Sequence, residues 1–370
     1  MRSRAIQNMR GFSLIELLIS MALGLIILAS VTQFFKMGMN TSQVVSQRAE
    51  MQQDVRAAIN LVAKDVGMAG AGIPTGGVSL PYGPGNNGSS FFAVDQTGTA
   101  WMANNTYLSG NLGTPASPVF NHMYSLIPGP ANGMQLLGPA VIAATGTAAD
   151  AITSIYVDYS FPLNQYVVTF PNNTSINLAP PVPAPAPPLP AVDDPAVGIK
   201  VGDLILLTNN KGSVMSEVTG VTPGGGKITF ADRDPLNINQ SGAAAGNIAK
   251  ISAGTNTVAY RAYAVTYFVD ATNPQTRLMR QVNGQLPEPV ADNIIALKFT
   301  YDMCDGSTTG AALATCANIS NPIAAGYTPN DIHKVNISVM GQSLTGTQAQ
   351  NMELVTSVST RNMNFKDRYN

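Results

Sequence analysis

The sequence predicts an α+β protein, in which one long N-terminal α-helix packs on an antiparallel β-sheet domain with long loops. Residues 17–35 carry no charged side chain, and apolar side chains then recur at helical spacing as far as Val66. Beyond residue 150, short runs of β-branched and aromatic residues are separated by turn-forming glycine, proline and asparagine, a pattern typical of antiparallel strands. The 34 glycines and 25 prolines among 370 residues favour turns over further long helices.

A basic start followed by an apolar run predicts a membrane anchor at the N-terminus. Arg2, Arg4 and Arg10 precede the run, and no acidic residue lies among the first ten. As a helix, residues 17–35 would span about 28 Å, close to the roughly 30 Å core of a bilayer. The run is longer than the core of a secretory signal peptide and lacks its small-residue cleavage site. Since basic residues stay cytoplasmic, we expect a single pass that places the chain after about residue 36 outside.

One acidic side chain, Glu16, lies just inside the apolar run. An ionised side chain at the centre of a membrane helix costs about 2.5–3.5 kcal/mol on insertion scales, and less near the helix end. A plain anchor does not need this carboxylate. Its presence therefore indicates a function and a partner that compensates its charge.

Residues 10–17, Arg-Gly-Phe-Ser-Leu-Ile-Glu-Leu, resemble the class III signal of type IV prepilins and type II secretion pseudopilins. The resemblance implies that a prepilin peptidase cuts between Gly11 and Phe12, which removes residues 1–11 as a leader, and that Phe12 is then N-methylated. It also implies that Glu16 faces the N-terminal amine of a neighbouring subunit. That amine is largely cationic at neutral pH and can compensate a buried carboxylate. The protein would lie in the bacterial inner membrane and then in a pilus, in the periplasm or at the cell surface.

The pilin-type helix is expected over residues 12–68, with residues 14–35 as its transmembrane part. After residue 40, apolar positions alternate with polar ones at helical spacing, which predicts a stripe that packs on the globular domain. A cluster of glycines that begins at Gly67 ends the helix, and Gly24 and Gly38 are points at which it could bend. The apolar stripe consists of Val44, Met51, Val55, Ile59, Val62 and Val66.

Residues 69–370 are expected to form the globular domain outside the membrane. Residues 70–150 are rich in glycine, asparagine and serine, and predict long surface loops with few strands. Residues 179–190 contain seven prolines, which predict an exposed polyproline II loop because proline cannot join a sheet interior. Strands are predicted over residues 152–159, 166–170, 204–208, 214–221, 227–230, 258–269, 277–282, 294–301, 333–340 and 354–360.

Several segments of the C-terminal half also resemble the PilW-type minor pilin family. They are residues 267–270 with 277–280, residues 292–301, and residues 359–362. This resemblance implies a subunit that works with other minor pilins and with major pilins in the initiation or tip complex of a type IV pilus, a filament used for adhesion and twitching motility. Two alternatives remain: a J-like minor pseudopilin of type II secretion, and an adhesion or binding module on a pilin-type anchor.

Cys304 and Cys316 predict a disulfide if the domain is exported, because neither a CxxC motif nor a nearby histidine indicates a metal or redox site. Closing a loop of this size would stabilise the fold by roughly 3 kcal/mol in the chain-entropy model. Asp232 and Asp234 begin a loop whose side-chain oxygens, with those of two asparagines, could hold calcium. The glycine and the final glutamate of an EF-hand are absent, so a solvated turn is the preferred interpretation and no metal is predicted.

Charge and composition argue against several classes of function. The formal net charge is −1 and no basic run follows residue 10, so we expect no nucleic-acid partner. Residues 223–229 contain a glycine-rich turn and a lysine, but they lack the phosphate-loop spacing and its serine or threonine. Two histidines and a single tryptophan leave little material for acid–base catalysis. We therefore predict that the protein is not an enzyme and binds neither a cofactor nor a small-molecule substrate.

Overall fold

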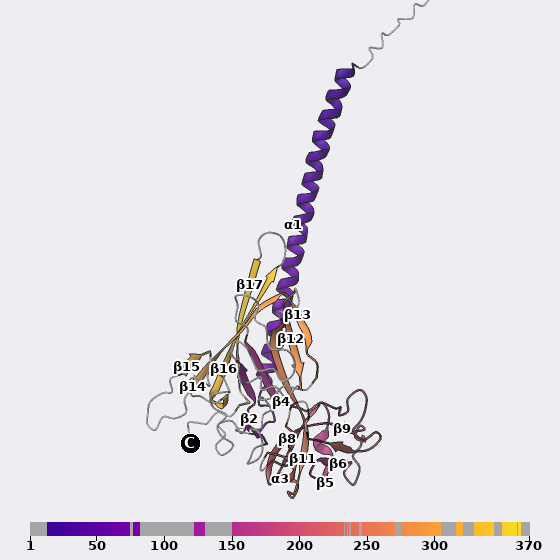
Figure 1. The fold of residues 1–370 in the computed structure, drawn as a ribbon, viewed down its shortest axis with the longest axis vertical. Helices are drawn as coiled ribbons and strands as arrows, with labels where there is room; N and C mark the ends of the chain where they lie inside the picture. The colour runs from indigo at the N-terminus through magenta and orange to yellow at the C-terminus, as the bar shows by residue number, and fades with distance from the viewer. Residues whose placement is uncertain are drawn as a thin grey trace, which may run out of the picture.

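The fold consists of a long N-terminal helix, three β-sheets and a distal lobe (Figure 1). The computed structural model describes residues 13–74, 77–81, 122–129, 150–270 except 233, 235, 237, 244 and 245, 275–304 except 284, 316–320, 329–343, 350–360 and 362–363. The α+β prediction is confirmed, because one long apolar helix stands on mainly antiparallel sheets. Most of the loops predicted between residues 70 and 150, with the glycine-rich turn at 82–88, lie outside the described residues.

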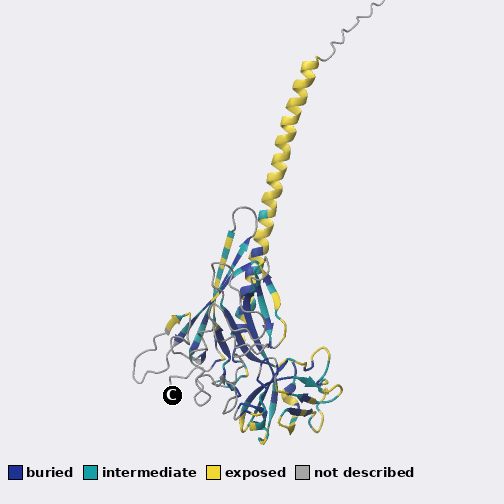
Figure 2. Ribbon diagram, viewed as in Figure 1, coloured by how far each residue is buried: buried dark blue, intermediate teal, exposed yellow. Residues whose placement is uncertain are grey.

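Helix α1 (Leu14–Met68) runs without interruption for 55 residues, through both Gly24 and Gly38. At 1.5 Å per residue it is about 82 Å long. Its first half is exposed, while the apolar stripe of its second half is buried in the globular domain (Figure 2). The helix ends where Gly70 adopts a φ of 83°, and a Cβ there would lie only 2.8 Å from the Asn362 carbonyl oxygen. The buried helical residues are Met51, Val55, Ala58, Ile59, Val62, Asp65 and Val66.

The largest sheet is organised by β11 (Val258–Asp270), its longest strand. One edge of β11 pairs with β4 (Ala151–Asp158), and the other pairs in succession with β12 (Arg277–Val282) and β7 (Leu204–Asn209). Asn283 fills the gap between those two neighbours, since its amide accepts the Ala264 N–H (2.8 Å) and donates to the Ala262 carbonyl (3.3 Å). The sheet also contains β13 (Glu288–Asp292), β8 (Gly212–Glu217), β1 (Val78–Ser79), β2 (His122–Met123) and β3 (Leu126–Gly129).

A second, antiparallel sheet carries the C-terminal strands in the order β15 (Cys316–Ile319), β14 (Ile294–Cys304), β16 (Ile332–Ser343) and β17 (Gln350–Ser359). Helix α1 packs on β16 and β17 and also contacts β13 and β4, so its buried half joins both sheets. The helix and the sheet approach closely at Gly341, where a Cβ would lie 2.5 Å from a methyl group of Val55. The predicted strands of this region are confirmed, and β17 begins earlier than predicted. A short 3₁₀ turn, η3 (Pro329–Asp331), precedes β16.

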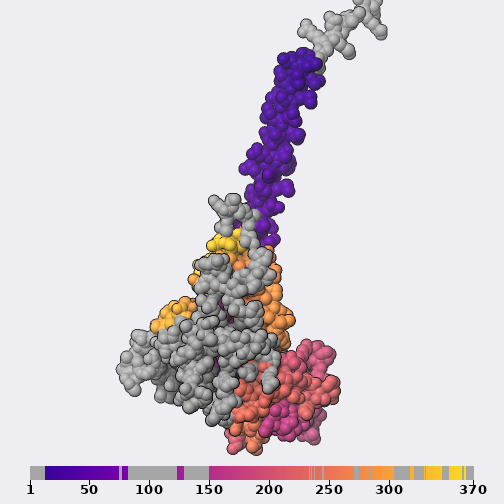
Figure 3. All heavy atoms as spheres, in the orientation of Figure 1, coloured from indigo at the N-terminus to yellow at the C-terminus, as the bar shows by residue number. Residues whose placement is uncertain are grey.

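Residues 159–257 are inserted between the paired strands β4 and β11 and form a lobe at the end of the molecule opposite the exposed helix (Figure 3). The lobe has its own hydrophobic cluster around Phe161, Ile176 and Phe230. The glycine-rich turn at residues 223–226 is a hairpin turn between β9 (Gly220–Val221) and β10 (Lys227–Thr229), rather than a phosphate loop. Besides β7 and β8 the lobe contains η2 (Leu163–Gln165), β5 (Val167–Asn172), β6 (Ser175–Ala179), β9 (Gly220–Val221), β10 (Lys227–Thr229) and α3 (Ile248–Ile251).

The proline-rich loop lies on the surface of this lobe, as predicted. Val182 is 97% exposed, and the loop is tethered where the Tyr166 hydroxyl donates to the Pro190 carbonyl. The chain bends at residues 182–183 and 186–187. Between these bends the loop is extended only in short pieces, rather than as continuous polyproline II.

Candidate functional site

The exposed helix segment, residues 14–45, presents a largely apolar surface. Apart from the half-buried Val44, its large apolar side chains are between 45% and 79% exposed, including Leu14, Phe34 and Val45. Exposing such a surface to water is unfavourable, so it must be covered by lipid tails or by other apolar helices. The helix is long and apolar enough to cross a membrane.

Four hydroxyl groups of this segment are already hydrogen-bonded within the helix. Ser20, Ser30, Thr32 and Thr41 each donate to the carbonyl oxygen four residues earlier, at 2.8 Å. A hydroxyl satisfied in this way adds little polarity to the helix surface, so it can face hydrocarbon without an unpaired donor. These four hydroxyl residues are thus compatible with burial in lipid.

Glu16, in contrast, has no compensating cation within the described part of the helix. It lies in the first turn of α1, where the positive end of the helix dipole stabilises a carboxylate. The next charged residue of the helix is Lys36, about 30 Å further along the axis, so no ion pair forms within the described part of the helix. A cation that compensates Glu16 must come from another part of the chain or from another molecule. Gly11 and Phe12 lie outside the described residues.

A buried polar cluster locks the other end of α1 to the sheet. Asp65 is only 3% exposed and accepts three hydrogen bonds from side chains of the largest sheet. The Tyr156 hydroxyl donates to Oδ1 (3.0 Å), while the Tyr267 hydroxyl (2.6 Å) and Arg280 Nε (3.0 Å) donate to Oδ2. Burial, together with the charge of Asp65, raises the pKa of both tyrosines above the ordinary value, so they remain donors. The sequence holds one signal for this role of Asp65, because the residue lies three positions after Val62, on the buried face of the helix.

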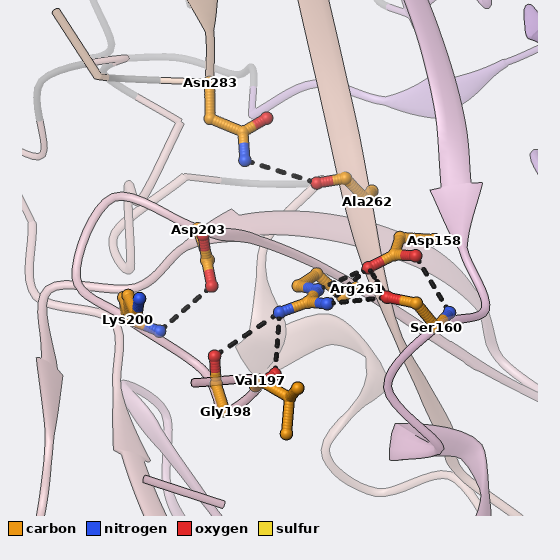
Figure 4. A network of polar contacts seen from close by, with 9 residues as sticks. All are labelled: Asp158, Ser160, Val197, Gly198, Lys200, Asp203, Arg261, Ala262 and Asn283. Carbon is orange, nitrogen blue, oxygen red and sulfur yellow. Dashed lines mark hydrogen bonds and ion pairs between the residues drawn. The ribbon is translucent and has the colours of Figure 1, made fainter. Parts of the chain in front are cut away.

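A second cluster attaches the lobe to the largest sheet through Arg261 (Figure 4). Arg261 Nε donates to Asp158 (2.7 Å), and NH2 donates to the Ser160 hydroxyl (3.0 Å) and pairs with Asp158 (2.5 Å). Its NH1 group donates to the carbonyl oxygens of Val197 (3.1 Å) and Gly198 (3.3 Å). Burial acts to raise the pKa of Asp158, but hydrogen bonds from Ser160 and Arg261 hold it below its ordinary value. All five N–H groups of Arg261 are therefore used by the protein itself.

A cleft of about 490 Å³ opens beside this cluster, between the lobe and the loop that joins β12 to β13. Both signs of charge face it, with Lys200 and Arg280 as cations and Asp203 and Glu288 as acids. Leu286 forms part of its rim and is 88% exposed. A cleft of this size, with donors, acceptors and an apolar rim, has the dimensions of a ligand site.

The aspartates that could have held calcium serve the protein's own backbone. Asp234 accepts the N–H groups of Ile238 (3.0 Å) and Asn239 (2.7 Å), and Asp232 accepts the N–H and hydroxyl of Ser241 (2.8 Å each). Asp232 is exposed, but Asp234 and Asn239 are each only 5% exposed, so the solvated turn expected from the sequence is wrong for these two. Among the described residues, no three metal-binding side chains gather.

Glu217 shares this buried loop with Asp234. It is 1% exposed, accepts the Leu236 N–H (2.9 Å) and is hydrogen-bonded to Asp234. Burial, reinforced by the hydrogen bond and the charge of Asp234, raises the pKa of Glu217 to about 9. The pair of carboxyl groups therefore holds a proton at neutral pH.

We expect Glu217→Gln to weaken the pH dependence of stability. The folded state keeps a proton that the unfolded state releases above the ordinary pKa of 4.5, so the free energy of unfolding falls between pH 4.5 and about 9. One proton contributes at most about 1.4 kcal/mol per pH unit. Glutamine can donate to Asp234 and accept from Leu236 without ionising, so the variant should lose this slope and be the more stable protein at pH 8. Urea unfolding at pH 5 and pH 8 measures the difference, and the exposed Glu288→Gln is the control, which should keep the slope.

Cys304 and Cys316 are brought opposite each other by the backbone. They form one pair in the antiparallel register of β14 and β15, next to Met303 and Ala317. Directly opposed residues have closely spaced Cβ positions in such a ladder. The disulfide stays a prediction, to which this register adds support.

The N-terminus matches a known family model. The prokaryotic N-terminal methylation motif matches residues 6–32, a range that includes Gly11, Phe12 and Glu16. No curated protein and no solved structure matches the chain. The motif is prepilin-type and supports a type IV pilin or pseudopilin, a structural class rather than an enzyme class; together with the apolar helix it supports membrane anchoring.

Proposed function

We propose that this protein is a minor pilin of the PilW-like kind, which takes part in the initiation or tip complex of a type IV pilus. The observation that carries the proposal is the exposed helix segment, whose apolar surface is interrupted near its start by the single carboxylate of Glu16. In a bundle of such helices, the cationic N-terminus left by cleavage after Gly11 supplies the charge that Glu16 lacks. Because only one axial stagger brings the amine and the carboxylate together, the pair also sets the register between subunits.

The size of the domain favours a low-copy position. About 300 residues follow the helix, and the lobe lies at the end of the molecule opposite the exposed helix segment (Figure 3). So bulky a subunit fits an end of the filament better than a repeated position in its shaft. A J-like minor pseudopilin of type II secretion has the same anchor, and deletion of the gene separates the two, since only the pilin reading predicts loss of pili.

A binding function for the same anchored protein is favoured by one feature, the cleft beside Arg261. The cleft lies between the lobe and the loop that joins β12 to β13, and it offers both donors and acceptors. Deletion that leaves pili intact but abolishes attachment would favour this adhesion module over the assembly role.

We expect Glu16→Gln to block assembly without blocking insertion. The neutral side chain leaves the neighbouring amine without its counter-charge, and a loss of 1.4 kcal/mol already lowers an association constant about tenfold. In cells that carry only this variant, the protein should fractionate with membranes, start at a methylated Phe12 by mass spectrometry, and be at least about tenfold depleted from sheared filaments. Ser20→Ala, on the same exposed helix segment, is the matched control and should assemble normally. Normal assembly of the glutamine variant, or a mature chain that starts elsewhere, would contradict the proposal.

A further inference from the structure

Strand β17 leaves a long hydrogen-bonding edge open. It is the last strand of its sheet and pairs with β16 over all ten residues without a shift in register. No other strand among the described residues pairs with its outer edge.

The backbone groups that face this edge follow from two hydrogen bonds. The Thr360 N–H donates to the His333 carbonyl (3.1 Å), which marks that opposed pair as hydrogen-bonded. On β16, the Gln342 N–H points the other way, to Asn293 (2.9 Å), so the pair of Gln342 with Asn351 is not hydrogen-bonded. Because the two kinds of pair alternate, every second residue directs both its N–H and its C=O to the open edge. These residues are Asn351, Glu353, Val355, Ser357 and Ser359.

The open edge lacks the usual protection against pairing. Natural edge strands are kept short or carry proline, lysine or a bulge. β17 has none of these, and its one charged side chain, Glu353, is held on the face of the sheet by the Ser338 hydroxyl (2.5 Å). Val355, at the middle of the edge, is 68% exposed.

The seam between β17 and α1 also leaves apolar surface incompletely covered. Met352, Leu354 and Val358 point toward the helix but are only half-buried, as is Leu61 of α1. A further strand beside β17 would place alternate side chains over this seam and bury more of it.

We propose that an extended strand of a different, neighbouring pilin subunit adds to β17 and continues this sheet. The inference rests on the proposed assembly function and specifies where a partner binds. β-Strand addition uses backbone hydrogen bonds for affinity and alternate side chains for specificity, which are the two features that β17 leaves open.

A second copy of this chain does not fit the edge. Figure 1 places β17 beside the buried half of α1, and the favoured antiparallel pairing of two β17 strands would point their membrane helices in opposite directions. Among the described residues, the other open edges are shorter: β15 has four residues, while β13 and β5 each contain a proline that cannot donate. The partner is therefore a distinct subunit anchored in the same membrane.

Photo-crosslinking in cells tests the contact directly. A benzophenone amino acid at position 355 of the full chain should give an adduct whose partner, identified by mass spectrometry, carries a prepilin-type N-terminus. The same probe at Val182, which is 97% exposed on the distal lobe, is the control and should not capture that partner. An adduct with a second copy, an adduct with a protein of another class, or no adduct at position 355 would overturn the proposal.

A proline substitution separates backbone pairing from side-chain contact. Val355→Pro removes an N–H that points to the open edge, whereas Val355→Thr keeps that N–H and the shape of the side chain. The proline variant should lower the yield of filaments about tenfold, because the ring removes the donor and also blocks the approach of the partner strand. The threonine variant should not lower it. If Val355→Pro proves unstable by thermal unfolding, Ser357→Pro replaces it. Equal yields for the proline and threonine variants would overturn the proposal.

The two proposals fail in different ways. Processing at Phe12 and loss of assembly in Glu16→Gln are independent of the edge, and should persist if β17 has no partner. If Glu16→Gln assembles normally, the filament function fails, whatever the variants of Val355 do.

Discussion

Replacing Asp65 by alanine is expected to destabilise the globular domain by about 3–5 kcal/mol, the cost of breaking a buried ion pair from one side. The substitution leaves the hydroxyls of Tyr156 and Tyr267 and the Nε of Arg280 without their common acceptor, in a place where water replaces it poorly. The substitution also removes the ion pair with Arg280 that ties the buried half of α1 to the largest sheet. Thermal and urea unfolding of the full chain in detergent measures the change.

Two further variants decide whether the polar cluster causes this loss. Lys64→Ala, one residue earlier on the exposed side of α1, should change stability by less than about 0.5 kcal/mol, as surface substitutions do. Asp65→Asn keeps one acceptor oxygen and should fall between the wild type and the alanine variant. A double substitution, Asp65→Ala with Tyr267→Phe, should cost less than the sum of the two single changes, because the contact is shared. Additive effects would show that Asp65 acts through the helix alone.

The regular elements of this fold could be predicted because each has a local signal. The stripe that includes Met51 and Val62 fixes the buried face of α1, and strands such as β11 and β16 have the expected apolar and β-branched residues. The boundaries of β17 could not be read in the same way. Its polar residues from Gln350 to Glu353 look like a loop, and they form a strand only because β16 pairs with them.

The polar clusters could not be predicted because their members are far apart in the sequence. Asp65 meets Tyr267 across 202 residues, and Arg261 meets Asp158 across 103. No local pattern encodes such pairs; they appear only when the sheet has brought the strands together. Glu217 and Asp234 are closer in the sequence, but their side chains also meet only in the folded protein. Their proximity contradicts the expectation that this loop is solvated.

The proposed assembly residue, Glu16, could be predicted from the sequence alone. Glu16 stands out from the sequence because a carboxylate within an apolar run violates the pattern around it. Its structural surroundings add one argument, the lack of a cation within about 30 Å along the helix. Under the proposed function, the amine of a neighbouring subunit completes the site, so its second half lies outside this chain.

The second large effect on stability is expected for the substitution Arg261→Met. The side chain of Arg261 is 9% exposed and that of Asp158 is 10% exposed, so the variant leaves a nearly buried carboxylate without its cation. Two carbonyl oxygens of the loop at Val197 and Gly198 and the Ser160 hydroxyl also lose their partner. We expect a loss of about 3–5 kcal/mol in the free energy of unfolding.

The pair of Arg277 with Asp292 is a matched control in the same sheet. Its members lie 2.9 Å apart, but they are 36% and 50% exposed, so solvent screens their attraction. Arg277→Met should therefore cost no more than about 1 kcal/mol. Equal losses for the two variants would mean that burial does not decide the strength of these ion pairs.

Hydrogen exchange distinguishes whether Arg261 stabilises only the nearby loop or the whole domain. Because Arg261 ties the loop around residue 197 to the strand pair that flanks the insertion, its removal should raise hydrogen exchange first in residues 191–203. The C-terminal sheet of β14 to β17 should keep its protection, since none of the hydrogen bonds described for Arg261 involves it. If exchange instead rises throughout β14, β16 and β17, then the lobe and the helix-bearing sheets unfold as one unit, and Arg261 stabilises the domain as a whole.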